Sequence, residues 1–126
     1  TADQSGTGQG AFLNLDWSLN SAANPVERGS WIQMYATGGG ITNPPGTTGA
    51  QTSYPPLYSL AGDISVGIAG RRVPSSDVVA FSAPDLVSGA VQINVKIPTD
   101  IPAGQAEVLV RIGDQTSRSG VTIAVK

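Results

Sequence analysis

The sequence predicts an all-β fold, an antiparallel β-sandwich, and three observations support that prediction. Several short segments alternate apolar and polar residues with the period of two that half-buried strands require. The chain contains 16 glycines and 9 prolines, 25 of 126 residues, which supply many turns between those segments. No segment sustains the 3.6-residue period of an amphipathic helix. These features are typical of one β-rich domain of ordinary size.

The clearest strand is the segment 91–97, whose aliphatic side chains share one face and whose polar side chains share the other: Val91, Ile93, Val95 and Ile97 against Gln92, Asn94 and Lys96. A corner at 98–104 follows, and then alternating runs at 106–112 and 121–125. We expect these three strands to be neighbours or nearly so. Burial of their aliphatic faces would form the core between two sheets.

Earlier in the chain we predict a lead-in at 1–8 and a domain spanning 9–126, with strands at 11–15, 30–37, 64–68 and 76–82. The small polar residues of the lead-in are typical of a linker. Ala69 to Arg72 indicates a tight hairpin turn. The segment 37–58 is rich in glycine and proline, and an irregular loop of that length normally packs on the body or has a function. Because the chain begins at Thr1 without Met, we expect a processed product or a piece of a longer protein.

Composition argues against several classes of function. The net charge is −2, and Arg71-Arg72 is the only basic pair, so the basic stripe of a nucleic-acid binder is absent. No apolar run is long enough to cross a membrane, so we expect no membrane insertion. The chain lacks both Cys and His, which removes thiol chemistry and the commonest general base. The acidic residues are dispersed and mostly occupy turns, so we predict no enzyme activity, no catalytic residue and no cofactor.

Four phrases of the sequence resemble one known family: Leu13-Asn14-x-Asp16-x-Ser18-Leu19-Asn20-Ser21-x-x-Asn24-Pro25, Tyr35-Ala36-Thr37-Gly38-x-Gly40-x-Thr42-Asn43-Pro44-Pro45-Gly46, Gly89-x-x-Gln92-Ile93-Asn94-Val95-x-Ile97-Pro98 and Gly120-Val121-Thr122-x-Ala124-Val125. The family is the uncharacterised C-terminal Ig-like domain of large secreted proteins of soil acidobacteria, similar in style to IPT/TIG modules. The resemblance covers residues 9–126. It implies an Ig-like sandwich of seven to eight strands, an extracellular or cell-surface location and no catalytic residues. The sequence departs from the family at Trp17, where a small residue, commonly Gly, is usual, and at Trp31, where a small aliphatic residue is usual.

A calcium loop is the first candidate site, because oxygen-bearing side chains occupy alternate positions at Asn14, Asp16, Ser18 and Asn20. An EF-hand loop also requires Gly at its sixth position and Glu at its twelfth. Counted from Asn14, these positions hold Leu19 and Pro25. We therefore predict a hydrogen-bonded Asx turn and no metal site.

A surface of aromatic and polar side chains is the second candidate. Trp31 and Tyr35 share a strand face with Gln33, and three loop aromatics could gather beside them: Trp17, Tyr54 and Tyr58. Aromatic rings beside hydrogen-bonding groups are how many β-sandwich modules hold polysaccharides. The alternative, which the Tyr-Pro-Pro-x-Tyr segment favours, is that the 38–58 loop covers this face as a second, smaller core.

The sequence therefore predicts a non-catalytic C-terminal accessory module of a secreted or cell-surface protein, acting as a spacer or a docking surface. Its expected partners are other domains of a larger protein or another protein. A carbohydrate-binding module that uses the aromatic face is the alternative.

Overall fold

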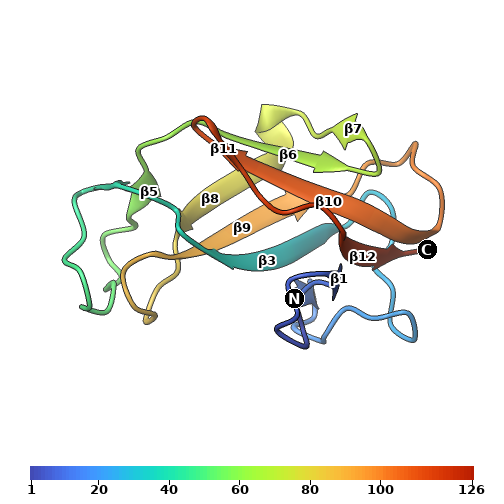
Figure 1. Cartoon of the computed structure of the whole chain (residues 1–126), viewed down its shortest axis with the longest axis horizontal. Coiled ribbons are helices and arrows are strands. Elements are labelled where there is room, and N and C mark those ends of the chain that lie inside the picture. Colours follow the sequence, from blue (N-terminus) through green and yellow to red (C-terminus); the bar gives the residue numbers. More distant parts are fainter.

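Two six-stranded sheets pack face to face in the computed structural model, which describes all 126 residues (Figure 1). One sheet has the order β1-β12-β10-β6-β7, with β11 paired to β10: β1 (Gly8–Gln9), β12 (Val121–Val125), β10 (Gly104–Ile112), β6 (Ile64–Ile68), β7 (Arg71–Arg72) and β11 (Gln115–Thr116). The other has the order β2-β3-β9-β8-β5-β4: β2 (Phe12–Asn14), β3 (Trp31–Thr37), β9 (Ala90–Lys96), β8 (Val78–Ser82), β5 (Ser59–Leu60) and β4 (Thr42–Asn43). A single 3₁₀ turn, Ser75–Asp77, precedes β8.

The order of the main strands is that of an immunoglobulin-like sandwich. Five of the twelve strands have only two residues, so seven longer strands form the body. Taken in chain order as A to G, they place A, B, E and D in one sheet and C, F and G in the other. The predicted fold class is therefore confirmed, and the predicted hairpin at Ala69–Arg72 joins β6 to β7.

The expected grouping of the three late strands is wrong in one respect. β10 and β12 pair antiparallel, as expected, from Gly104↔Val125 to Glu107↔Thr122. β9, however, pairs with β3 and β8 in the opposite sheet. The corner at 98–104 carries the chain from one sheet to the other, because the buried side chains of Ile97 and Ile101 anchor it between them. Alternation alone predicts that a strand has a buried face, not which sheet contains it.

The core consists of aliphatic side chains from the inner faces of both sheets. Ile32 and Met34 of β3 and Ile93 of β9 meet Ile68 of β6 and Ile123 of β12 in one buried cluster. At roughly 1.5–3 kcal/mol for each large side chain, burial of these residues is the main favourable term in the folding of the domain. Each strand consequently presents its alternate residues to solvent on an outer face.

The 38–58 loop lies at one end of the sandwich, where Figure 1 shows it beside the β8–β9 turn. Its backbone is tied to that turn by hydrogen bonds from Thr52 N to Leu86 O (2.9 Å) and from Ser88 N to Ala50 O (2.8 Å). The loop therefore packs on the end of the molecule, at the Thr37 end of β3. Trp31 and Tyr35 are both half-buried, and the hydrogen bonds of the loop attach it to the β8–β9 turn.

The N-terminal residues fold back against the body. β1 pairs in parallel with β12, and Gly8 N donates to Gly120 O (2.7 Å). Ala2 N donates to Gln9 O (2.9 Å), so residues 2–9 form a closed loop at the sheet edge. This loop places Thr1 beside the side of the sandwich that lies between β3 and β10.

Candidate binding surface

The outer face of the β2-β3-β9-β8 sheet combines aromatic and amide side chains. Strand register aligns them in rows, because residues that pair across an antiparallel sheet point to the same face. One row contains Leu13, Gln33, Asn94 and Val79, and the next contains Tyr35, Gln92 and Phe81. Trp31 pairs with Lys96 at the end of the sheet. We call these nine residues the platform.

The amide groups of the platform are held in place by their neighbours. Gln92 Nε2 donates to Asn94 Oδ1 (3.0 Å), and Tyr35 Oη lies 3.4 Å from Gln33 Oε1 as a donor. Each bond joins residues two apart on one strand, so both reinforce the direction that the pleat already imposes. Lys96 is the only charged side chain of the platform. The platform is therefore a nearly neutral surface of rings and fixed hydrogen-bonding groups.

The platform combines residues from two strands that are distant in the sequence. Gln92 and Asn94 lie on the polar face of β9, and Trp31 and Tyr35 lie on one face of β3. Only the pairing of β3 with β9 makes them one surface. Phe81 was missed as a member because β8 is apolar on both faces, so its alternation shows no contrast.

The remaining aromatic candidates lie away from the platform. Tyr54 is 69% exposed in the 38–58 loop. Tyr58 precedes Ser59, whose partner Phe81 points outward, so strand alternation directs Tyr58 to the other side. Trp17 lies in the hairpin that follows β2. Of the six candidates, the structure therefore brings only Trp31, Gln33 and Tyr35 together.

Trp17 occupies a backbone position that normally requires glycine. Asn14 N donates to Ser18 O (2.8 Å) and Trp17 N donates to Asn14 O (3.0 Å), which closes a three-residue hairpin loop. The last residue of such a loop adopts a left-handed conformation, and Trp17 has φ = +67°. Gly is the usual residue at this position because it has no Cβ to clash. Trp17 is nevertheless 66% exposed, so packing within its own chain does not explain it.

The predicted Asx turn is confirmed at the same hairpin. Asp16 Oδ1 accepts hydrogen bonds from Ser18 N (3.0 Å) and Ser18 Oγ (2.5 Å). The hydroxyl and then the amide of Ser18 lower the pKa of Asp16 below its ordinary value of 3.8. The carboxylate oxygen that would begin a calcium loop is thus engaged by the turn itself.

Asn20, another residue of the calcium hypothesis, is a fully buried structural group. Its side-chain oxygen accepts from Ala124 N (2.9 Å) and Gln9 Nε2 (3.0 Å). Its amide nitrogen donates to Ala124 O (3.0 Å) and Asn14 Oδ1 (3.1 Å). All four hydrogen-bonding positions are filled, and they join the β2 hairpin to β12 across 104 residues of sequence.

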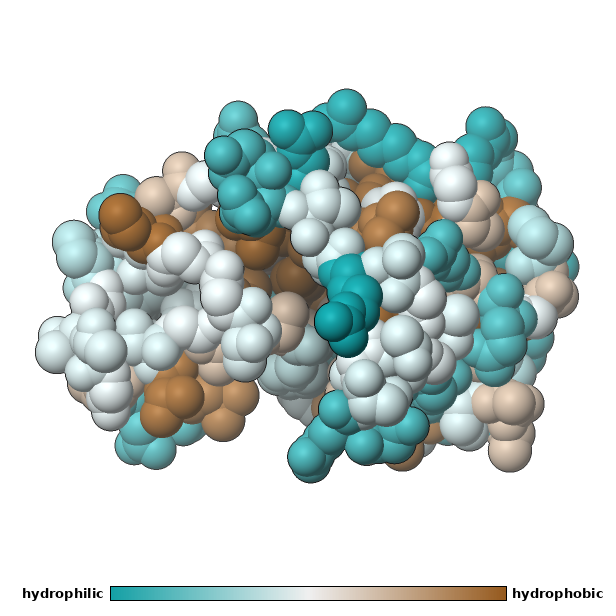
Figure 2. Space-filling model, viewed as in Figure 1, coloured by the Kyte–Doolittle hydropathy of each residue, from teal (hydrophilic) through white to brown (hydrophobic).

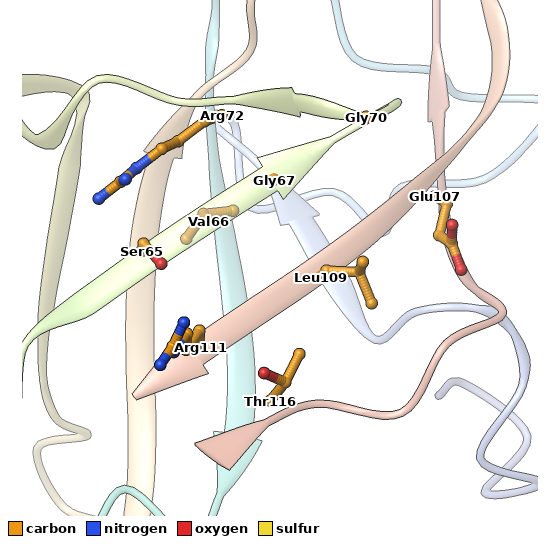
Figure 3. Close-up of a pocket in the computed structure, with 9 residues that line it drawn as sticks. All are labelled: Ser65, Val66, Gly67, Gly70, Arg72, Glu107, Leu109, Arg111 and Thr116. Atoms are coloured by element: carbon orange, nitrogen blue, oxygen red, sulfur yellow. The ribbon is translucent and has the colours of Figure 1, made fainter. Parts of the chain in front are cut away.

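The outer face of the other sheet has a shallow hollow of about 280 Å³ (Figure 3). Arg72 and Arg111 lie toward one end of it, and Glu107 lies at the other. Glu107 Oε1 accepts from Gly120 N (2.8 Å), and Arg111 Nε donates to Gly113 O (2.9 Å). These charged groups therefore brace the loop between β10 and β12. On the neighbouring hairpin, Arg71 forms an exposed ion pair with Asp100.

No group of three or more acidic side chains comes close enough to hold a metal ion. The structure also contains no helix with the length and hydrophobicity needed to span a membrane. Comparison of the chain with protein-family models, curated proteins and solved structures gives no match.

Proposed function

We propose that this chain is a non-catalytic accessory module of a secreted or cell-surface protein, at the C-terminal end of that protein, and that the platform is its docking surface. The alignment of Trp31, Gln33 and Tyr35 with the amide groups of β9 carries the proposal. Aromatic rings supply large contact area at low entropic cost, and fixed amides supply directional hydrogen bonds. Partners of this surface are other domains of the parent protein or a separate protein.

The proposal is tested in the parent protein by comparing two surface substitutions. Trp31→Ala removes the largest ring of the platform, and Leu109→Ala removes an apolar side chain from the outer face of the opposite sheet. We expect deletion of residues 9–126 to reduce secretion or protease resistance of the parent, and Trp31→Ala to have the same effect. Leu109→Ala should leave both unchanged. Equal behaviour of both variants and the wild type would contradict a docking role for the platform.

The second candidate function is carbohydrate binding on the same surface. The observation that favours it is the alternation of rings and amides, since rings stack on the apolar faces of sugars while amides bind hydroxyl groups. The near absence of charge suits a neutral polysaccharide.

Affinity electrophoresis in gels containing neutral polysaccharides distinguishes this ligand from a protein. We expect retardation of the wild type and of Tyr54→Ala, and loss of retardation in Trp31→Ala and Gln92→Ala. Unretarded migration of the wild type in every polysaccharide would exclude this second candidate and leave the docking proposal standing.

A further inference from the structure

The hairpin after β2 exposes three apolar side chains beside the platform, where Leu19 is the bridge partner of Leu13. Leu15 is 61% exposed, Trp17 66% and Leu19 55%, and together they form what we call the knob. A bulky residue with positive φ is strained, and such strain is concentrated at functional sites of proteins. The hairpin under the knob is rigid, because the Asp16–Ser18 turn and the buried Asn20 hold it. Trp is among the residues enriched at the hot spots of protein interfaces.

The molecule also contains an apolar crevice between its two sheets. β2 pairs with β3 only from Ile32 to Met34, and β12 pairs with β10 only from Gly104 to Glu107. Beyond these pairs, β3 has no neighbouring strand on this edge of the sandwich, and β10 has none until it reaches β11. A crevice of about 260 Å³ reaches the core there, and its lining includes Phe12, Met34, Ala36, Ile93, Val108 and Val110. Figure 2 shows a hollow with a hydrophobic floor where Figure 1 places β3 beside β10 and β11.

We infer that the knob of one copy of this chain inserts into the crevice of a second copy. The crevice is large enough for one aromatic side chain, and nine of its thirteen lining residues are hydrophobic. Phe12 of the crevice and the knob belong to one strand and the hairpin that follows it. A two-fold pair can therefore engage both sites, with each knob in the partner crevice.

Charge supports this occupant over a lipid surface. Asp16 lies beside the knob in the hairpin loop, and its hydrogen bonds with Ser18 lower the pKa of its carboxyl. A carboxylate beside the knob opposes approach to a bilayer, whose surface is anionic. Arg118 follows Ser117 of the crevice, and its Nη1 lies 2.9 Å from where a Cβ on Gly6 would be. Arg118 has no carboxylate partner in its own chain, so it is available to Asp16 of the second copy.

Sedimentation velocity of the 126-residue chain over a wide concentration range tests the pair. Two knobs give an interface at the small end of the range for proteins, so we expect a dimer with a dissociation constant on the order of 10–100 µM. Trp17→Gly should weaken association at least tenfold. It should also raise the melting temperature of the monomer, because Gly relieves the left-handed backbone. Tyr54→Ala, which removes an equally exposed aromatic residue elsewhere, should leave association unchanged.

A mixing experiment identifies the acceptor. Ala36→Leu fills the crevice and should weaken association as Trp17→Gly does; if that variant fails to fold, Ser117→Leu at the crevice mouth replaces it. Trp17→Gly keeps an intact crevice, and Ala36→Leu keeps an intact knob, so their mixture should form a heterodimer held by one of the two contacts. Its affinity should lie between those of the wild type and of either variant alone. The inference is overturned if Trp17→Gly dimerises as the wild type does, or if that variant has a lowered melting temperature. It is also overturned if the wild type forms oligomers larger than a dimer, or if the mixture stays monomeric.

Discussion

At the scale of single residues, the molecule depends on a few polar side chains whose roles the sequence pattern obscures. Asn20 lies in a stretch that resembles the first half of a calcium loop. Its four hydrogen bonds instead join two distant segments of the fold. The distinction depends on burial, which alternate spacing of oxygen-bearing residues does not reveal.

Replacement of Asn20 tests this structural role. Asn20→Ala leaves the amide and carbonyl of Ala124 without those partners in a buried site, and each unsatisfied group costs about 1–3 kcal/mol. We expect the free energy of unfolding to fall by about 3 kcal/mol or more in urea denaturation. Gln105→Ala, an exposed change on β10, should stay within about 0.5 kcal/mol of the wild type. An equally small effect for Asn20→Ala would show that the four bonds add little.

Asp16 provides a test by pH. Because folding lowers the pKa of this carboxyl, its contribution to stability is present above pH 3.8 and is lost as the pH falls toward the lower folded value. Ser18→Ala removes the hydroxyl, the larger of the two lowering influences. We expect the pKa of Asp16, followed by carbon NMR of the carboxyl group, to rise toward 3.8 in this variant. An unchanged pKa would assign the shift to the backbone amide alone.

At the scale of strands, the alternation of apolar and polar residues predicts which face of a strand is buried but not which strands pair with it. The faces of β3 and β9 were both predictable, because Ile93 and Met34 alternate strictly with polar or aromatic neighbours. Their pairing was not, since either strand could have joined the opposite sheet with the same burial. The platform is a product of that pairing, so its β3 and β9 residues could be predicted as two separate faces, but their union in one surface could not.

The two faces of β9 should respond differently to charge. Ile93→Asp places an unpaired carboxylate in a fully buried site and should prevent folding, as judged by circular dichroism. Asn94→Asp keeps the oxygen that accepts from Gln92 and lies on the half-exposed platform. We expect a change within about 0.5 kcal/mol in the free energy of unfolding. Destabilisation of comparable size in both variants would show that the platform is covered.

Loops account for the rest of what the sequence did not predict. The 38–58 loop contains two tyrosines and four prolines, a composition that suits a segment packed over the aromatic face. Its position depends instead on hydrogen bonds that join the β8–β9 turn to the backbone of Ala50 and Thr52 and to the buried Thr52 hydroxyl. The backbone bonds form between any residue types, so the composition of the loop does not predict them.

At the scale of the whole molecule, the outer faces of the two sheets carry different kinds of side chain. The outer face of the β1-β12-β10-β6-β7 sheet carries charged groups that brace its own loops. The outer face of the β2-β3-β9-β8 sheet carries aromatic rings and amides whose side-chain hydrogen bonds stay within their own strands. This asymmetry is the physical basis for assigning a docking role to one face only.

The central claim is that the platform faces solvent and does not form a second core. Iodide quenching measures this directly in Trp17→Gly, where Trp31 is the only tryptophan. We predict that iodide quenches the fluorescence of the folded variant with a slope between zero and that of the unfolded chain, because Trp31 is partly exposed. Fluorescence that iodide leaves unchanged would place Trp31 beneath a cover and contradict the account.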